Sequence, residues 1–261
     1  MEINKIYNID CIQGMKQIDS ESIDMIFCDL PYGKTKNKWD NVIPYEPMWK
    51  QFERIIKPNG AILLFGQDKF TARTMLSNEE LHRYNIIWKK TTPTGFLNAN
   101  RMPLRTHEDI MVFNTDIEMP DREDIMVFYK SLPTYNPQMT YGVLNHKKGG
   151  GNHKFTQRCY GKMKDTPTII TNEKYPISVL DFNREKECYH PTQKPVNLIS
   201  WLVRTYTNEG DVVLDNCSGS GTTAIACIKE KRHFVCFEKD ENYWKKSVER
   251  VKNEQRQLTL F

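Results

Sequence analysis

Residues 25–33, MIFCDLPYG, place an acid and an aromatic ring at the end of an apolar run. The carboxylate of Asp29 and the main-chain carbonyl of Leu30 could both accept hydrogen bonds from an exocyclic amine, since Pro31 fixes the turn that presents the carbonyl. The ring of Tyr32 offers a flat face on which an extruded base could stack. The other interpretation is an N-cap aspartate before a Pro-Tyr turn, and this stretch alone leaves both open.

A second stretch, VVLDNCSGSGTTA at 212–224, has the pattern of a strand, a tight turn and a helix start. Gly219 and Gly221 would let the backbone approach a ligand, and we expect Thr222 or Thr223 to cap the helix whose N-terminus faces that ligand. The stretch also satisfies the pattern G-x-G-x-x-A, so a dinucleotide site has to be weighed.

Two acids next to this loop narrow the choice of ligand. Glu238 ends the following strand, FVCFE, where it could accept hydrogen bonds from ribose hydroxyls. Asp215, directly before the loop, would repel a pyrophosphate but suits a cation that carries an amino group and a sulfonium. The strand also starts too late in the chain to open a dinucleotide domain. These points favour S-adenosylmethionine (AdoMet).

Two blocks of alternating strand and helix signals would position these residues. In the first block, SIDMIFCDL and GAILLFGQ read as short strands around YEPMWKQFERIIKPNG, where Met48, Phe52, Ile55 and Ile56 recur at helical spacing before a closing Pro-Asn-Gly. The last block, from residue 211, repeats the alternation. It predicts a doubly wound, mostly parallel α/β sheet, with both motifs at the carboxyl edge where such sheets bind ligands.

The middle of the chain, residues 114–189, has a different composition, rich in Pro, Asn, Thr, Tyr and Lys with few apolar runs. Its segment NHKKGGGNHKFTQRCYGKMK interleaves basic residues with Phe155 and Tyr160 around a triple glycine. This mixture suits a surface that follows a nucleic-acid backbone and stacks bases, although a solvated loop fits equally well. The hexapeptide EDIMVF occurs at 108–113 and 123–128, and we expect one of the copies to be a core strand.

The overall composition is that of a folded domain. Of 261 residues, 39% are hydrophobic and 27% charged, with a net charge of +4, which excludes a disordered tail and is compatible with nucleic acid. The seven cysteines are scattered without a CxxC pair, so we expect no disulfide framework and no metal site. There is no apolar signal core and no apolar run of membrane length, so we expect a cytoplasmic, nucleoid-associated protein.

Five motifs in one order resemble those of the β-group AdoMet-dependent DNA amino-methyltransferases, bacterial and phage enzymes with an Asp-Pro-Pro-Tyr catalytic motif. DLPYG resembles that motif, and DNCSGSGTT resembles the AdoMet loop Asp-Pro-Phe-x-Gly-Ser-Gly-Thr-Thr. HPTQKPVNLISWLVRTYT is similar to the helix-opening motif of the methionine pocket, YNIDCIQGMKQIDSESIDMIF to the N-terminal segment, and RTHEDIMVF to the strand before the target-recognition region. Leu30 replaces the first proline, and Asn216 and Cys217 replace Pro and Phe of the loop.

The resemblance implies a Rossmann-like methyltransferase domain formed by 1–113 and 190–256, a target-recognition insert at 114–189 and a tail at 257–261. The implied reaction is metal-free transfer of methyl from AdoMet, leaving S-adenosylhomocysteine, to N6 of an adenine flipped out of DNA. The expected catalytic residues are Asp29, Leu30, Pro31 and Tyr32. The expected cofactor-binding residues are Asp10, Cys11, Asp29, Lys194, Pro195, Asp215, Asn216, Cys217, Ser218, Gly219, Gly221, Thr222, Thr223, Glu238 and Lys239. The expected DNA-binding residues are Lys34, Lys36, Lys38, Arg101, Arg105, Lys147, Lys148, Lys154 and Arg158.

Three other functions stay open from the sequence: an N4-cytosine DNA methyltransferase, a methyltransferase of RNA bases or protein glutamine, and an inactive DNA-binding protein with a degenerate AdoMet fold. The final segment, 257–261, reads QLTLF and fits the Q-L-x-L-F pattern by which bacterial proteins bind the DNA polymerase sliding clamp. A terminal strand or a helix end folded onto the body is the alternative for this tail. A homodimer is common in the family that the chain resembles.

Overall fold

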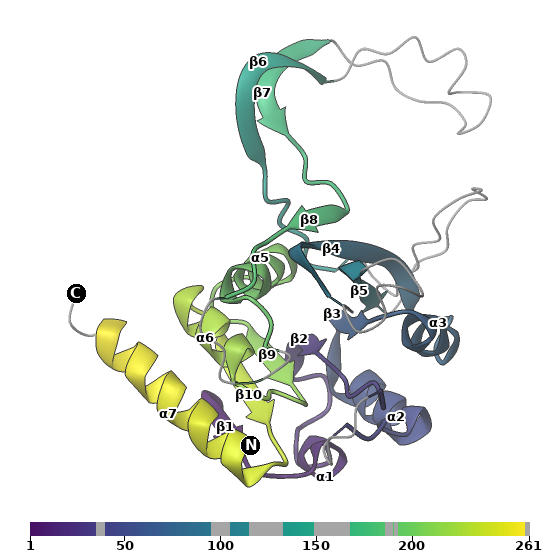
Figure 1. Ribbon diagram of the computed structural model, residues 1–261, viewed down its shortest axis with the longest axis vertical. Coiled ribbons are helices and arrows are strands. Elements are labelled where there is room, and N and C mark those ends of the chain that lie inside the picture. The colour runs from purple at the N-terminus through teal and green to yellow at the C-terminus, as the bar shows by residue number, and fades with distance from the viewer. Residues whose placement is uncertain are drawn as a thin grey trace.

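Strands from both ends of the chain meet in one eight-stranded sheet of order β1-β10-β9-β2-β3-β5-β4-β8 (Figure 1). The computed structural model describes residues 1–34, 40–94, 105–114, 133–148, 168–185, 190 and 193–258. The strands of the sheet are β1 (Lys5–Tyr7), β2 (Ile23–Cys28), β3 (Ile56–Gly66), β4 (His82–Thr94), β5 (Arg105–Asn114), β8 (Val179–Asp181), β9 (Val212–Asp215) and β10 (His233–Phe237). Strand β5 runs antiparallel to β3 and β4, and the other pairs are parallel. The sheet is therefore mostly parallel, as the alternating pattern predicts.

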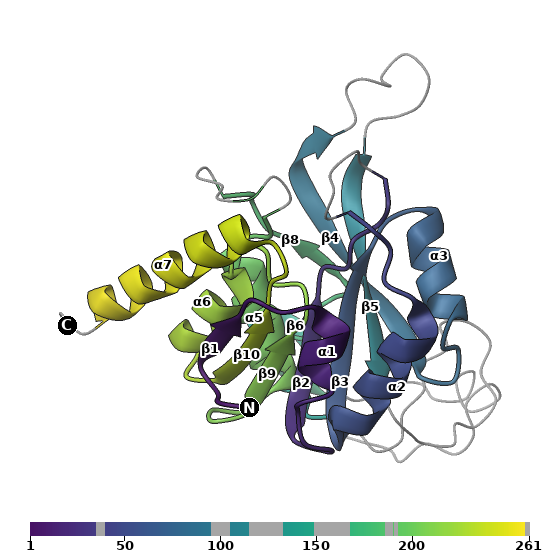
Figure 2. The same cartoon turned by 90° about the horizontal axis from the view of Figure 1, so that it is seen from below.

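Helices cover both faces of the sheet (Figure 2). One layer contains α1 (Cys11–Met15), α2 (Tyr45–Ile55) and α3 (Lys69–Leu76), and the other contains α5 (Val196–Tyr206), α6 (Thr222–Lys229) and α7 (Glu241–Leu258). The prediction of a doubly wound α/β fold is therefore confirmed. Across the described ranges, no helix combines the length and the apolar character that a membrane crossing requires.

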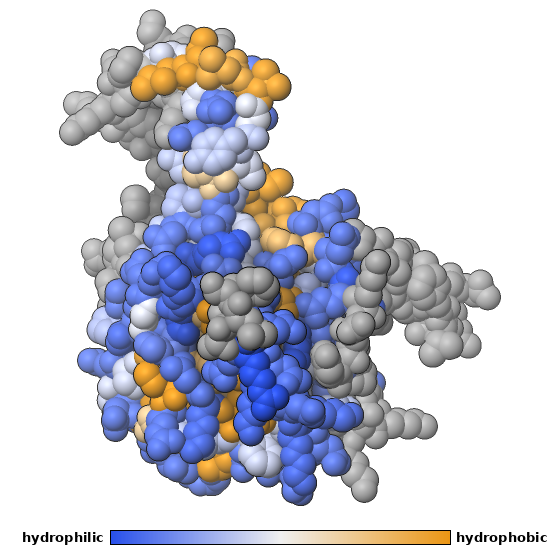
Figure 3. Space-filling view, turned by 90° about the vertical axis from the view of Figure 1, so that its left-hand side faces the viewer, coloured by the Kyte–Doolittle hydropathy of each residue, from blue (hydrophilic) through white to orange (hydrophobic). Residues whose placement is uncertain are grey.

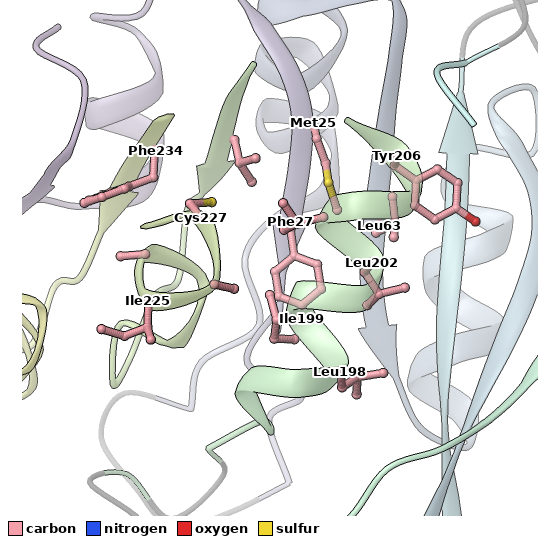
Figure 4. Packing of buried hydrophobic residues seen from close by; sticks show 14 of the residues in the cluster. Met25, Phe27, Leu63, Leu198, Ile199, Leu202, Tyr206, Ile225, Cys227 and Phe234 are labelled. Atoms are coloured by element: carbon pink, nitrogen blue, oxygen red, sulfur yellow. The ribbon is translucent and has the colours of Figure 1, made fainter. Parts of the chain in front are cut away.

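Alternate residues of the central strands face opposite layers. In β2, Met25 and Phe27 join the apolar cluster that contains α5 and α6, whereas Ile26 and Cys28 join the cluster that contains α1 and α2. Figure 4 shows Phe27 beside Ile199 of α5. Because β2 is buried on both faces from Met25 onward, that part of its sequence is a continuous apolar run, and the acids lie only near its two ends, Asp24 at the start and Asp29 after the last residue.

Helix α2 ends one residue earlier than its periodicity predicts. Ile56 is the first residue of β3 and pairs with Ile23 of β2, so the Pro-Asn-Gly at 58–60 lies inside the strand and does not close the helix. A Cβ on Gly60 would lie 2.6 Å from the side chain of Ile56 and 2.8 Å from the carbonyl oxygen of Asp24. The glycine is therefore required by the close approach of two strands, a constraint that the helix pattern does not reveal.

The first EDIMVF copy, 108–113, is the core strand: it lies in β5 between β3 and β4. The second copy, 123–128, lies outside the described residues. From the expected insert, β6 (Thr140–Lys148) and β7 (Ile169–Lys174) form an antiparallel ribbon that stands off the body, with apolar side chains on its outer part (Figures 1 and 3). Strand β8 comes from the same expected insert but pairs with β4 in the main sheet.

Candidate active site

Parallel pairing of β2 with β9 brings the two sequence motifs to one edge of the sheet. Met25 lies opposite Val213 and Ile26 opposite Leu214, so Asp29 and the glycine loop follow neighbouring strand ends. Strand β10 pairs with β9 on the other side and leads to Glu238. The two motifs therefore lie together at the carboxyl edge of the sheet, as the order of strands in the sequence predicts.

A cavity of about 860 Å³ opens at this edge, within the usual size of small-ligand pockets. Most of the residues predicted to bind cofactor or to act on the substrate line it. They are Asp10, Cys11, Asp29, Leu30, Pro31, Tyr32, Lys194, Asp215, Asn216, Cys217, Ser218, Gly219, Thr222, Thr223, Glu238 and Lys239. Pro195 and Gly221 are not in its lining. Pro195 instead immediately precedes α5, and Gly221 precedes α6.

The glycine loop is held by the acid that follows β10. Gly219 and Gly221 have φ angles of +49° and +74°, which side chains rarely adopt. Glu238 accepts a hydrogen bond from the main-chain N–H of Gly219 at 2.8 Å and another from that of Asp240 at 2.7 Å. Each oxygen of Glu238 therefore already has a main-chain donor, and the carboxylate fixes the loop while it borders the cavity.

The expectation of a threonine cap on α6 is wrong. The N-cap residue is Gly221, and no side chain caps the helix. Thr223 instead donates its hydroxyl to Asp215 at 2.5 Å, because the carboxylate at the end of β9 lies directly beneath the helix start. The second oxygen of Asp215 accepts from the N–H of Cys217 at 3.0 Å.

Asp215 is a buried acid without a cationic partner among the described residues. Its side chain is 4% exposed, and burial raises its pKa to about 7. Asp29 and Glu238 add to the increase, while its two hydrogen bonds oppose it. Among the described residues, no lysine, arginine or histidine forms an ion pair with it. A ligand with a positive charge would supply the missing partner.

Two further polar side chains on the cavity wall lack hydrogen-bond partners within the described part of the chain. Asn216 is 2% exposed with neither amide atom bonded, and the hydroxyl of Ser218 is also unbonded. Buried polar groups are normally satisfied, so these atoms are suited to receive a ligand. Together with Asp215 and the glycine loop, they fit AdoMet, which carries an amino group, a carboxylate, a sulfonium and a nucleoside.

Both carboxylate oxygens of Asp29 are occupied by neighbouring donors. The hydroxyl of Tyr32 donates to Oδ1 at 3.0 Å, and the ammonium of Lys194 donates to Oδ2. Burial raises the pKa of Asp29, and Lys194 opposes this by favouring the carboxylate. Burial also raises the pKa of Tyr32 well above its usual value, so its hydroxyl remains a donor. Lys194, predicted as a cofactor ligand, thus contacts Asp29, the predicted catalytic residue.

Two charged residues of the site were not predicted from the sequence. Glu108 on β5 and Lys90 on β4 form a buried ion pair, and Lys194 lies 3.4 Å from the other oxygen of Glu108. All three line the cavity. No local pattern in the sequence marks Lys90 or Glu108: each lies inside its strand next to another charged residue, Lys89 or Asp109. Only the pairing of β4 with β5 places them together.

The turn after the predicted catalytic motif is fixed by Asp40, whose oxygens accept from the N–H groups of Gly33 at 2.8 Å and Lys34 at 2.9 Å. The ring of Tyr32 packs against Phe70 with centroids 4.7 Å apart. Lys34, a predicted DNA contact, forms an exposed ion pair with Asp68 at 3.0 Å. The other predicted DNA contacts are not described, either as residues (Lys36, Lys38, Arg101, Lys154, Arg158) or as side chains (Arg105, Lys147, Lys148).

The N-terminal motif closes the far wall of the cavity. Asp10 caps α1 by accepting from the N–H of Ile12 at 3.1 Å, and its other oxygen pairs with Lys239 at 3.1 Å. Cys11, the first residue of α1, borders the cavity with Cys217. In the described ranges, no group of three or more His, Cys, Asp or Glu side chains is arranged to hold a metal ion.

The fold and the site define a Rossmann-like AdoMet-dependent methyltransferase. A family model, N6_N4_Mtase, described as DNA methylase, matches residues 23–249, and the chain belongs to this family. It is 24% identical to the type II methyltransferase M1.MboII of Moraxella bovis over 93% of this chain and 94% of that one. It is 26% identical to the DNA adenine methyltransferase YhdJ of Escherichia coli K12 over 96% and 83%.

Solved structures of similar fold cover nearly the whole chain. The complex of M1.HpyAVI with SAM matches with a TM-score of 0.60 at 21% identity, covering 94% of this chain and 98% of that one. The cytosine-N4-specific PvuII DNA methyltransferase matches with a TM-score of 0.64 at 14% identity, covering 96% and 90%.

Proposed function

We propose that this enzyme transfers a methyl group from AdoMet to the N6 amine of an adenine flipped out of DNA. The observation that carries the proposal is the position of Asp29 and the glycine loop on one cavity, with a buried acid, Asp215, for a cationic donor. Adenine is supported by YhdJ, which is named a DNA adenine methyltransferase, and by the resemblance of DLPYG to the Asp-containing motif.

Asp29 and the Leu30 carbonyl would act on the acceptor nitrogen. The lone pair of an exocyclic amine is delocalised into its ring, so the amine is a weak nucleophile. Two acceptors that take both N–H groups favour a pyramidal nitrogen with its lone pair directed at the methyl group. The N–C bond then forms as the S–C bond breaks, S-adenosylhomocysteine is left as a neutral thioether, and the positively charged nitrogen releases one proton to water. Orientation and charge stabilisation of this kind contribute roughly several kcal/mol.

The remaining predicted residues would hold the two substrates. Tyr32, backed by Phe70, presents a ring face for the flipped base. Asp215, Asn216 and Ser218 would hold the cofactor. We assign DNA backbone contacts to the lysines that follow Tyr32 and to the basic segment of the insert 114–189.

Incubation of the protein with labelled AdoMet and mixed-sequence duplex DNA, followed by digestion and mass spectrometry of the nucleosides, tests the proposal. We expect N6-methyladenine. N4-methylcytosine would agree with the mechanism but contradict adenine as the target base. AdoMet binding without any methylated nucleoside would indicate an RNA or protein substrate. Absence of both binding and methylation would indicate an inactive DNA-binding protein.

We also propose that the last five residues bind the DNA polymerase sliding clamp, which would bring the enzyme to newly replicated DNA in the nucleoid. Helix α7 extends to Leu258, so Gln257 lies in its final turn and would have to unwind to bind as an extended peptide. Deletion of 257–261 should abolish pull-down by the clamp and leave methylation of short oligonucleotides unchanged. Equal pull-down before and after deletion would exclude this partner. Sedimentation of the same samples tests whether a homodimer forms.

A further inference from the structure

Each oxygen of the proposed catalytic carboxylate already accepts a hydrogen bond before any substrate arrives. Tyr32 occupies Oδ1 of Asp29, and Lys194 occupies Oδ2. An acceptor amine can donate to Asp29 only if one of these donors leaves or shares its oxygen. Which donor moves depends on the energetic cost of leaving Asp29.

Lys194 cannot simply leave. Its side chain is 8% exposed, and burial opposes its charge, so an unpaired ammonium in this position would be strongly destabilised. Asp29 and Glu108 together outweigh burial and raise the pKa of Lys194, which keeps it protonated. A move away from Asp29 therefore requires a second anion within reach.

Glu108 provides that anion and is held ready for it. Its Oε1 is bonded to Lys90 on the neighbouring strand, which fixes the side chain. Its Oε2 lies 3.4 Å from the ammonium of Lys194 and has no hydrogen-bond partner among the described residues, although it is buried. A small movement of the Lys194 ammonium would turn this long contact into a hydrogen bond.

We propose that Lys194 passes from Asp29 to Glu108 when the acceptor amine reaches Oδ2 of Asp29, and that Glu108 is the positioning residue that permits this move. The proposal rests on the proposed function, since the amine is the acceptor of the methyl group. Lys90 stabilises Glu108 before and after the move. The charge of the four-residue group formed by Asp29, Lys194, Glu108 and Lys90 stays at zero throughout.

The charges around Asp29 determine the sign of the test. The negative charge of Glu108 raises the pKa of Asp29, and Lys194 lowers it. Asp215 and Tyr32 also face it, but they are unchanged in the variants below. Loss of the charge of Glu108 should lower the pKa of Asp29, whereas loss of Lys194 should raise it. The acid limb of kcat/KM, which reports the free enzyme, should follow in the same directions.

The variant Glu108→Gln tests the role of the receiving oxygen. Its amide oxygen can still accept from Lys90, but its NH₂ group faces Lys194 and offers no acceptor. We expect kcat to fall about 10- to 100-fold, with the Kd of AdoMet within about twofold of wild type and the acid limb moved to lower pH. Glu230→Gln, which breaks the ion pair with Arg204 away from the cavity, is the matched control and should change none of these.

A double-mutant cycle separates this role from simple support of the fold. In a Lys194→Gln background no cation needs a receiver, so adding Glu108→Gln should no longer lower kcat and should shift the acid limb back toward lower pH. Equal losses from Glu108→Gln in both backgrounds, or an unmoved acid limb, would overturn the proposal. Titration of ¹³C-labelled Asp29 by NMR gives the same pKa shifts without turnover, so a protein that methylates no DNA would refute the proposed function separately.

Discussion

Asp29→Asn is expected to lower kcat by on the order of 10³-fold while the Kd of AdoMet stays within about threefold of wild type. Asparagine offers one acceptor oxygen where aspartate offers two, and its NH₂ group would face the N–H of the incoming amine. The variant should still fold, because Lys194 retains Glu108 as a buried anionic partner. Single-turnover transfer from labelled AdoMet gives the rate of the chemical step, and calorimetry gives the affinity.

Tyr32→Phe is the matched control for this experiment. It removes the hydroxyl that donates to Asp29 but keeps the ring that packs against Phe70, so its loss in rate should be about tenfold or less. If Asp29→Asn methylates DNA at a rate comparable to wild type, Asp29 is not the acceptor of the amine. A parallel loss of AdoMet affinity would instead assign Asp29 to the cofactor.

The fold and the main elements of the site could be predicted from the sequence because both depend on local patterns. Apolar runs that end in Asp29 and Asp215 indicated two buried strands, and the glycines marked the loop between strand and helix. Order along the chain, combined with the rule that ligands bind at the carboxyl edge, then placed the two motifs together. The β2–β9 pairing shows that this reasoning needed no long-range information.

The charge network around Asp29 could not be predicted in the same way. Lys90 and Glu108 lie on consecutive strands, whereas Lys194 comes from a helix entry far from both in the chain. Strand β5 joins the sheet antiparallel between β3 and β4. That insertion is not required by the alternating strand–helix pattern. The Thr222 and Thr223 prediction was wrong for a related reason: Asp215 lies where the helix cap would bind, and it takes the hydroxyl of Thr223.

Asp215→Asn is expected to weaken AdoMet binding about 30-fold at pH 7.5, since a charge-assisted contact contributes about 2 kcal/mol. The Asn side chain can keep the local structure: its oxygen accepts from Cys217, and its NH₂ group donates to Thr223. In the wild type, a pKa of about 7 means that the carboxylate protonates as pH falls below 7. The Kd of wild type should therefore rise about fourfold between pH 6.5 and 5.5, approaching that of the variant, and the Kd of the variant should stay flat.

The same substitution should have the opposite effect on the ligand-free protein. An Asp with a pKa raised above its unfolded value of about 3.9 favours the folded state fully at low pH, and this stability is lost as pH rises through about 7. At pH 8 the ligand-free wild type therefore holds a buried, unpaired carboxylate, and Asp215→Asn should melt at an equal or higher temperature. Saturating AdoMet should then raise the melting temperature of wild type far more than that of the variant.

Asp211→Asn is the control, since Asp211 precedes the same strand and accepts from the N–H of Asn208 without bordering the cavity. It should bind AdoMet as wild type does at every pH. Equal affinity of Asp215→Asn and wild type at pH 7.5 would contradict the assignment of the cation to Asp215. A lower melting temperature of ligand-free Asp215→Asn at pH 8 would show that the carboxylate already has a stabilising partner. A cation-binding site of this kind requires a buried acid that lowers the stability of the ligand-free protein and raises its affinity for the cation. The melting temperature tests the first property, and the Kd of AdoMet tests the second.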